Sequence, residues 1–179
     1  MVFTKQYPTE TEERERYRFH NNTIENHGYV TFLYQAITPA LPYLKGQQHG
    51  LDYGCGPEPV LSKLLEQNHS LYCKNYDPLF FRELPSGKFD FIFSTECFEH
   101  FHNPAKEIVH IKKLLEPGGV LVVMTALWNE TLNLSTWHYL RDITHVCVFH
   151  STTFDYVCQQ FGFVQLYNDS RRVVILRSI

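Results

Sequence analysis

Long apolar runs are missing from this chain: none of its hydrophobic stretches reaches the roughly 18 residues that a membrane-spanning helix needs. The first 19 residues are too polar for a secretory signal peptide. The five cysteines are odd in number and form no Cys-x-x-Cys pair, which argues against a disulfide framework and a structural zinc site. We therefore expect a cytoplasmic protein that folds in a reducing compartment and has no membrane partner.

The sequence also lacks an excess of basic over acidic residues. The formal net charge is -3, and no run of Lys or Arg offers the clustered positive charge that phosphate contacts need. A nucleic-acid partner is therefore disfavoured. Hydrophobic residues make up 44% and charged residues 20%, as in ordinary soluble proteins, and 179 residues are enough for one domain with its own core. Nothing in the sequence indicates the oligomeric state.

Helix and strand patterns alternate along most of the chain. A continuous apolar strand at 120–126 is typical of strands that are buried on both faces of a parallel sheet. The tail at 163–177 reads as a hairpin around Asn-Asp-Ser-Arg. The other expected strands precede Gly54 and span 70–76 and 89–94, and the expected helices span 10–19, 29–44, the stretch from Val60, 103–119 and 151–162. This order predicts an α/β fold, a three-layer doubly wound sheet that is mostly parallel and ends in an antiparallel hairpin.

Residues that start and stop helices are found at several of these boundaries. Proline should end the 29–44 helix near Pro39 and Pro42. Asn103 is a suitable cap, with proline at the first helical position after it, and the glycines at 118–119 should end that helix. Ser151 and Gly162 should cap and end the last helix.

A glycine turn, Asp52-x-Gly54-x-Gly56, lies between a strand and a helix. Glycine lets the chain turn sharply and lets a ligand touch the backbone. A dinucleotide site would have a third glycine where this chain has Pro59, which counts against a nicotinamide-dependent oxidoreductase. Asp77 closes the next strand, 25 positions past Asp52, near the separation expected of an acid that binds ribose hydroxyls. Because the carboxyl ends of parallel strands share one edge, these residues and 94–100 should line one crevice.

The ordered set of this turn, the acid at 77, "FDFIFSTECFEH" and "LEPGGVLVVMT" resembles the class I S-adenosylmethionine-dependent methyltransferase family. The resemblance covers most of the chain from residue 48 onward. It implies a Rossmann-like core over 47–179 within one domain of 1–179, a helical lid over 1–46, S-adenosylmethionine as the cofactor and a methyltransferase activity. The cofactor-binding residues that it implies are Asp52, Gly54, Cys55, Gly56, Asp77, Pro78, Thr95 and Glu96.

Two departures from the family pattern stand out. Glu58 occupies the place of the family's third glycine, where a side chain would crowd the cofactor if it folded inward. Only eleven residues separate Asp77 from Phe89, too few for the usual helix and third strand, so the sheet should be reduced there. The adenine ring would then pack against the apolar residues at 79–81.

The stretch Glu96-x-x-Glu99-His100 directly follows an expected strand. If the chain turns helically at 96, all three side chains point the same way. Together with His145 they resemble the metal ligands of small-RNA 3′-end 2′-O-methyltransferases, and ubiquinone-pathway O-methyltransferases share the first part. The resemblance implies a divalent metal (Mg, Mn or Zn) on Glu96, Glu99, His100 and His145, with Glu99, His100 and His145 as catalytic residues.

Simpler roles for the same residues remain open. A histidine after this strand also serves as a general base, or as a hydrogen-bonded wall residue, without any metal. His145 next to Asp142 is equally compatible with a structural histidine. In the N-terminal segment, the candidates for contacting the cofactor or substrate are Tyr17, His20 and Asn21.

We expect methyl transfer to the hydroxyl of a small molecule, with metal assistance as an option. Two alternatives stay open: a module that binds S-adenosylmethionine or a nucleotide without catalysis, and an RNA 2′-O-methyltransferase. The sequence carries no recognisable code for the acceptor.

Overall fold

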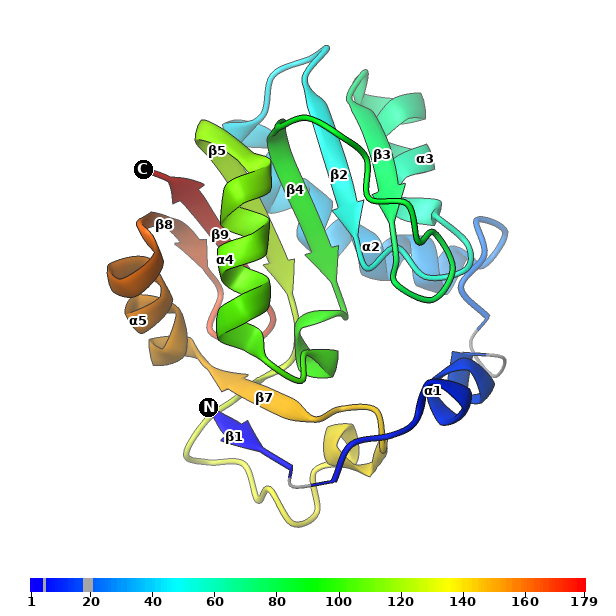
Figure 1. Cartoon of the computed structure of the whole chain (residues 1–179), viewed down its shortest axis with the longest axis vertical. Helices are drawn as coiled ribbons and strands as arrows, with labels where there is room; N and C mark the ends of the chain where they lie inside the picture. The colour runs from blue at the N-terminus through cyan, green and yellow to red at the C-terminus, as the bar shows by residue number, and fades with distance from the viewer. Residues whose placement is uncertain (5, 18–20) are drawn as a thin grey trace.

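The computed structural model describes residues 1–4, 6–17 and 21–179. Its main sheet has six strands in the order β3–β2–β4–β5–β9–β8 (Figure 1). The first four pair in parallel, and β9 runs antiparallel between β5 and β8. The strands are β2 (His49–Tyr53), β3 (Tyr72–Tyr76), β4 (Phe89–Thr95), β5 (Leu115–Met124), β8 (Phe163–Asn168) and β9 (Val173–Ser178). The predicted mostly parallel sheet with a terminal hairpin is confirmed.

Helices cover both faces of this sheet. Helices α2 (His27–Ala40) and α3 (Val60–His69) lie on one face, and α4 (Pro104–Leu114) and α5 (Ser151–Phe161) on the other (Figure 1). Each helix buries residues three or four positions apart, because these share one side of a 3.6-residue turn. On α2 and α3 they are Leu33, Ala36, Ile37, Ala40, Val60, Leu61, Leu64 and Leu65. The three-layer arrangement predicted from the sequence is therefore present.

Several helix boundaries differ from those expected. The Asn103 side chain caps α4 by accepting from Lys106 N (3.1 Å), as predicted, but α4 ends at Leu114 instead of at the glycines. Pro117 disfavours the helical conformation of the residue before it and has no N–H to continue the helical hydrogen bonds. The helix therefore stops early, and β5 already begins at Leu115. Ser151 is the first residue of α5, and the cap is His150, whose ring Nδ1 accepts from Thr152 N (3.2 Å).

The region of the missing third strand is a compact turn. After β3 the chain folds back so that Asp77 and Phe81 exchange two backbone hydrogen bonds of 3.0 Å. It reaches β4 without another strand in this described stretch, so β3 is an edge of the sheet. The reduction that the short spacing predicted is confirmed.

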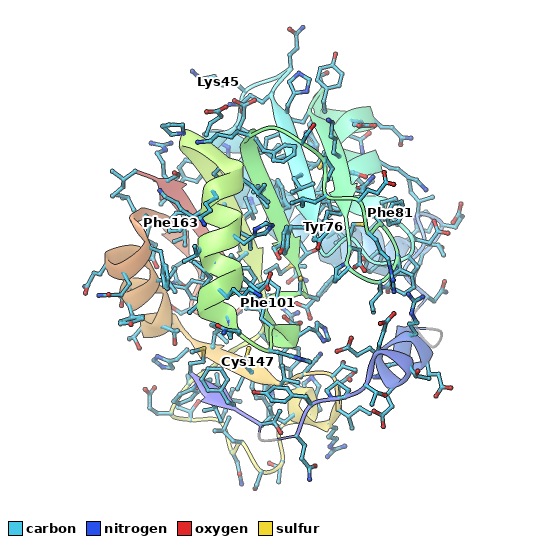
Figure 2. All side chains as sticks on the ribbon, in the orientation of Figure 1. Lys45, Tyr76, Phe81, Phe101, Cys147 and Phe163 are labelled. Carbon is cyan, nitrogen blue, oxygen red and sulfur yellow. The ribbon has the colours of Figure 1, made fainter. Side chains whose placement is uncertain are left out.

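A second, small sheet was not predicted. It joins β1 (Val2–Phe3), β7 (Cys147–His150) and β6 (Leu127–Trp128), and it lies beyond the carboxyl ends of the main strands (Figure 1). The Cys147 thiol donates to the carbonyls of Phe98 (3.2 Å) and Phe101 (3.6 Å), which ties β7 to the loop after β4 (Figure 2). The remaining helices are α1 (Glu10–Tyr17) and the 3-10 turns η1 (Leu41–Tyr43), η2 (Phe98–His100) and η3 (His138–Arg141). No helix in the described ranges is long and apolar enough to cross a membrane.

Candidate active site

The glycine turn after β2 is clamped to the end of β3. Gly54 and Gly56 have φ values of 85° and 68°, in the left-handed region that favours glycine. The Tyr76 carbonyl accepts from Gly54 N (2.8 Å) and Cys55 N (3.2 Å), and the Asp77 carboxylate accepts from Gly56 N (3.0 Å). A Cβ on Gly54 would lie 2.2 Å from the Cys97 sulfur, whereas one on Gly56 would meet nothing within 4 Å. Gly54 is required for packing, and Gly56 faces open space.

Two cavities meet at this turn. The first, of about 360 Å³, extends from Gly56 and Asp52 to His100 and His145. The second, of about 390 Å³, lies on the side of Asp77, and Gly54 and His100 line both. The predicted cofactor residues divide between them. Asp52, Gly54, Cys55, Gly56, Thr95 and Glu96 line the first cavity, and Gly54, Asp77 and Pro78 line the second.

Asp77 is 4% exposed, and both of its oxygens accept hydrogen bonds from the backbone. Besides Gly56, the donors are Leu79 N (2.8 Å) and Phe80 N (3.1 Å). Its carboxylate therefore holds the glycine turn against the loop that replaces the third strand. The ribose contact expected of Asp77 stays a prediction. Of the apolar residues at 79–81, Leu79 lines the second cavity.

Asp52 is a buried acid on the wall of the first cavity. It is 2% exposed, and its Oδ1 finds no hydrogen-bond partner within the described residues. Burial and the charge of Asp77 raise the pKa of Asp52 to about 8, and burial with the charge of Glu99 raises the pKa of Glu96 to about 8. A cationic group in this cavity would favour the ionised form of both carboxyls. Glu58 is among the residues that line the first cavity, but its side chain is exposed and lies 3.7 Å from Lys63 Nζ.

The raised pKa of Asp52 has a consequence for stability. Between pH about 4 and about 8 the folded protein keeps a proton on Asp52 that the unfolded chain has released. The wild-type free energy of unfolding should therefore fall as pH rises through this window, and Asp52→Asn should not share that loss. We expect the melting temperature of Asp52→Asn relative to wild type to increase by several degrees from pH 5 to pH 8 and then level off. The matched control is Asp155→Asn, on the exposed face of α5. A difference that does not vary with pH would contradict the assignment.

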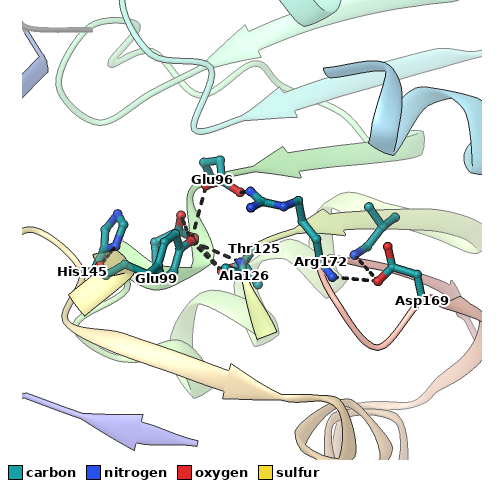
Figure 3. Close-up of polar contacts among 9 residues, drawn as sticks. Glu96, Glu99, Thr125, Ala126, His145, Asp169 and Arg172 are labelled. Atoms are coloured by element: carbon teal, nitrogen blue, oxygen red, sulfur yellow. Dashed lines mark hydrogen bonds and ion pairs between the residues drawn. The ribbon is translucent and has the colours of Figure 1, made fainter. Parts of the chain in front are cut away.

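The loop after β4 does not have the expected helical start. Glu96 has a φ of 47°, and its N–H donates to the Met124 carbonyl (2.7 Å), so the chain is still held to β5 at this point. The turn η2 begins only at Phe98. The expectation that 96, 99 and 100 share one helical face is wrong. Glu96 instead binds the guanidinium of Arg172, on the hairpin between β8 and β9, at 2.9 Å (Figure 3).

Glu99, His100 and His145 do come together. Each offers one ligand atom, and these atoms lie within 4.8 Å of one another. Both histidine rings are oriented by a backbone carbonyl: His100 Nδ1 bonds to Thr144 O (2.9 Å) and His145 Nδ1 to Tyr139 O (2.6 Å). Such a bond directs Nε2 toward the ligand side and is the usual support of a metal-binding histidine. Three of the four predicted metal residues thus form a cluster, which Glu96 does not join.

Tyr139 is the residue that sequence reasoning missed. Its hydroxyl donates to Glu99 Oε1 and its carbonyl accepts from His145, so it holds two members of the cluster at once. Glu99 is 0% exposed, and its second oxygen accepts from the Thr125 hydroxyl at 2.8 Å. The only local signal was an aromatic residue in "WHYLRDITH", six positions before His145.

The His145 ring bonds to the Tyr139 carbonyl and not to the Asp142 side chain. The His145 N–H donates to the Asp142 carbonyl (3.1 Å), which is also compatible with the structural histidine that the sequence left open. The Asp142 carboxylate accepts from Thr144 and from Arg16 of α1, which bind it at 2.6 Å each and keep its pKa below the usual range. Burial lowers the pKa of His145, so the ring is neutral at pH 7. A neutral, oriented imidazole can act as a metal ligand or a general base.

The N-terminal helix α1 reaches the loops around both cavities through polar contacts. Arg14 Nη2 donates to Leu79 O (2.9 Å), Arg16 binds Asp142, Glu10 pairs with Arg82, and Glu13 Oε1 lies 3.7 Å from His102 Nε2. Of the three candidate residues in this segment, His20 and the side chain of Tyr17 lie outside the described residues. The Asn21 carbonyl accepts from the side chain of Asn26, the cap of α2.

Comparisons with known proteins point to one family. A sequence model described as a methyltransferase domain matches residues 25–167. A curated relative, the malonyl-[acyl-carrier protein] O-methyltransferase of Paenibacillus sp. (strain JDR-2), is 42% identical over 52 residues, which are 29% of this chain and 19% of that protein. The chain is therefore matched to only a short part of that relative.

Solved structures share the fold. The 1,6-didemethyltoxoflavin-N1-methyltransferase of Burkholderia thailandensis, with bound S-adenosylhomocysteine, superposes with a TM-score of 0.66 at 16% identity, over 99% of this chain and 93% of that one. The phosphoethanolamine N-methyltransferase 2 of Haemonchus contortus superposes with a TM-score of 0.63 at 20% identity, over 87% of this chain and 42% of that one. Since the family model spans most of the chain, the protein belongs to the class I S-adenosylmethionine-dependent methyltransferases.

Proposed function

We propose that this chain binds S-adenosylmethionine at the glycine turn and transfers its methyl group to a hydroxyl of a small molecule. The observation that carries the proposal is the continuity of one cavity, which runs from Gly56 to His100 and His145. The proposed cofactor site and a set of acid–base or metal-ligating groups would therefore share one cavity. Small-molecule sites typically occupy such concave pockets at the carboxyl ends of parallel strands.

The residues around the two cavities suit the chemistry of S-adenosylmethionine. The cofactor carries an ammonium and a sulfonium cation, and the first cavity presents Asp52, with an unbonded oxygen, and Glu96. Gly56 leaves room for a ligand against the backbone, where any side chain would intrude. The second cavity offers Pro78 and Leu79 as apolar surface for a base. Asp52, Gly54 and Gly56 would hold the amino-acid portion, and Asp77, Pro78 and Leu79 the nucleoside.

When bound, the cofactor supplies an electrophilic methyl group that an aligned acceptor displaces directly. The protein has to orient the acceptor and remove its proton. His145 is suited to this because its ring is neutral at pH 7 and Nδ1 already bonds to the Tyr139 carbonyl, which leaves the lone pair on Nε2. The buried network around Tyr139 fixes the ring and the Glu99 carboxylate in place before the acceptor arrives.

Glu99, His100 and His145 also suit a divalent cation. One carboxylate and two imidazoles are a common donor set for Zn²⁺ and Mn²⁺, and here each donor has the supporting hydrogen bond that such ligands usually have. A cation held there would lower the pKa of the acceptor hydroxyl. The binding of a metal remains part of the proposal. His145 would be the base only without the ion, because an ion on Nε2 would occupy the lone pair that accepts the proton.

An O-methylating activity is favoured over the alternatives. The O-methyltransferase named above is consistent with an oxygen acceptor, although it matches a short part of the chain. Glu58 and the missing third strand motivated the non-catalytic binding module. The exposed position of the Glu58 side chain weakens the first reason, whereas the short edge of the sheet at β3 keeps the second, so the test must distinguish binding from transfer. The RNA alternative rests on the Glu-x-x-Glu-His resemblance alone.

The test has two stages. We expect S-adenosylhomocysteine to bind the chain with a micromolar dissociation constant by calorimetry, and the methyl group of labelled S-adenosylmethionine to appear in at least one member of a panel of neutral phenols and alcohols. Failure to bind S-adenosylhomocysteine would refute the proposal. Binding without transfer to any acceptor, including an RNA oligonucleotide, would favour the non-catalytic module.

We also propose that the N-terminal segment acts as a lid over the crevice. Helix α1 has no strong apolar side, and the ion pairs that attach it are Arg16–Asp142 and Glu10–Arg82, in which every side chain except Asp142 is well exposed, so that salt should screen them. Its closure should therefore be sensitive to salt. We expect hydrogen exchange of the α1 amides to become faster from 0.05 to 0.5 M NaCl and to be fast already at low salt in Arg16→Ala. If the hydrogen-exchange rates of the α1 amides change neither with NaCl nor in Arg16→Ala, a lid held by ion pairs is contradicted. The matched control is Arg177→Ala on β9, far from α1.

A further inference from the structure

The second cavity is lined by carboxylates from separate parts of the chain. Its volume is about 390 Å³, within the range of small-molecule pockets. Its described acids are Asp77 directly after β3, Glu107 on α4 and Glu13 on α1. A nucleoside in this cavity would present a ribose with two neighbouring hydroxyls. Each of these hydroxyls needs a hydrogen-bond acceptor once it is buried, and carboxylates are the usual acceptors for a ribose.

Asp77 can bind only part of such a diol. A carboxylate has about four acceptor positions on its two oxygens. Three of them are taken, because Oδ2 accepts from Gly56 N and Oδ1 accepts from Leu79 N and Phe80 N. The side chain is also 4% exposed. Asp77 therefore keeps about one position for a ligand, and the second hydroxyl needs an acceptor from another residue.

Glu13 suits this second position better than Glu107. The Glu107 carboxylate is bound to the wall of β2, since its Oε2 accepts from the Tyr53 hydroxyl at 2.7 Å. The Glu13 side chain is 19% exposed, and its Oε1 lies 3.7 Å from Nε2 of His102, which lines the same cavity. Burial raises the pKa of Glu13, His102 opposes the rise, and the charge of Asp77 adds to it. The two acids are therefore near enough to act on each other.

Helix α1 is fastened to two walls of this cavity. Arg14, the residue after Glu13, donates from Nη2 to the Leu79 carbonyl at 2.9 Å, in the loop that follows β3. In the segment before α1, the ring centroid of Tyr7 lies 4.5 Å from that of His102, just before α4. The helix itself lies beyond the carboxyl ends of the main strands (Figure 1). These contacts keep the Glu13 side chain at the wall of the cavity.

We propose that Glu13 accepts a hydrogen bond from one ribose hydroxyl of S-adenosylmethionine and that Asp77 accepts one from the other. The lid then supplies a ligand of its own to the cofactor, so that closure of α1 and cofactor binding favour each other. The inference rests on the proposed function, because it needs the nucleoside in the second cavity. In the sequence, Glu13 lies within the charged run 10–16, and no spacing sets it apart.

The experiment removes each partner of this hydrogen bond in turn. Calorimetry on the full chain measures the dissociation constants of S-adenosylhomocysteine and of its 2′-deoxy and 3′-deoxy analogues. In wild type, loss of either hydroxyl should weaken binding about tenfold, as expected for a hydrogen bond to a charged group. Glu13→Ala should weaken S-adenosylhomocysteine about tenfold, and one deoxy analogue should then bind this variant within about twofold of S-adenosylhomocysteine. The other analogue lacks the hydroxyl assigned to Asp77, and it should still bind about tenfold more weakly.

Two further variants separate recognition of the ribose from a role in holding the helix. Glu15→Ala makes the same change at an exposed position of α1 and should stay within about twofold of wild type for all three ligands. Glu13→Gln keeps an acceptor oxygen and should recover part of the affinity and part of the discrimination between the ligands. If Glu13 only stabilised α1, Glu13→Ala would weaken all three ligands equally, and the inference would be overturned.

The outcomes distinguish this inference from the proposed function. Tight binding of S-adenosylhomocysteine that is unchanged in Glu13→Ala would overturn the role of Glu13 and leave the cofactor site in place. The same holds if wild type does not discriminate against either deoxy analogue, or if Glu13→Ala still discriminates against both. If wild type does not bind S-adenosylhomocysteine at all, the proposed function and the role of Glu13 are both refuted.

Discussion

Replacing Gly56 by alanine is expected to weaken S-adenosylhomocysteine binding by about 100-fold while leaving the protein folded. A Cβ at this position would meet no protein atom within 4 Å, so the added methyl group enters the cavity that the ligand would fill. The left-handed backbone, with a φ of 68°, adds a folding cost of about 1–2 kcal/mol for a residue with a side chain. Calorimetry gives the affinity, and thermal unfolding gives the stability.

The matched control is Gly118→Ala. Gly118 has a φ of 79° and also faces open space, but it lies at the start of β5, at the opposite end of the sheet from the crevice. Both variants should lose a few degrees in melting temperature, and only Gly56→Ala should lose affinity. Equal affinity in the two variants would mean that the ligand does not lie against Gly56, and the assignment of the glycine turn would fail.

Much of the main sheet could be read from the sequence because its signals are local. The apolar strands, the glycine turn and the cap at Asn103 each act through neighbours a few positions away. The small sheet could not be read, because β1 and β6 have two residues each and exist only through pairing with β7. The end of α4 was misplaced because the double glycine was taken as the stop, whereas Pro117 and the pairing of Leu115 with Phe89 decide it.

Only part of the candidate site could be predicted from the sequence. The prediction that the side chains of Glu99 and His100 lie in one cluster was right because the two residues are adjacent, whereas the direction of the Glu96 side chain could not be predicted. A positive φ at Glu96 is set by a hydrogen bond to β5 and by Arg172, 76 positions away. Tyr139 was missed for the same reason: it acts on Glu99 across 40 positions, and no spacing rule connects the two.

The cluster of Glu99, His100 and His145 leads to the second large expected effect. We expect wild-type protein to bind Mn²⁺ and Glu99→Gln to weaken it by at least about 100-fold, because an anionic ligand is replaced by a neutral amide of the same shape. Tyr139→Phe, which keeps the carbonyl that orients His145 but removes the hydroxyl on Glu99, should weaken binding about 10-fold to 100-fold, as loss of a supporting bond usually does. Electron paramagnetic resonance of free Mn²⁺ measures all three affinities.

Glu96→Gln distinguishes a three-residue site from the four-residue site that the sequence predicted. Glu96 is bound to Arg172 and is not among the residues whose ligand atoms gather, so this variant should keep its Mn²⁺ affinity within about threefold. A loss as large as that of Glu99→Gln would mean that Glu96 leaves Arg172 to join the ion, and the four-residue set would be restored. If wild type binds no Mn²⁺ and EDTA leaves methyl transfer unchanged, the metal role is refuted. The hydrogen bond from His145 to Tyr139 would then support a general base alone, since a neutral imidazole of fixed tautomer needs no ion to accept a proton.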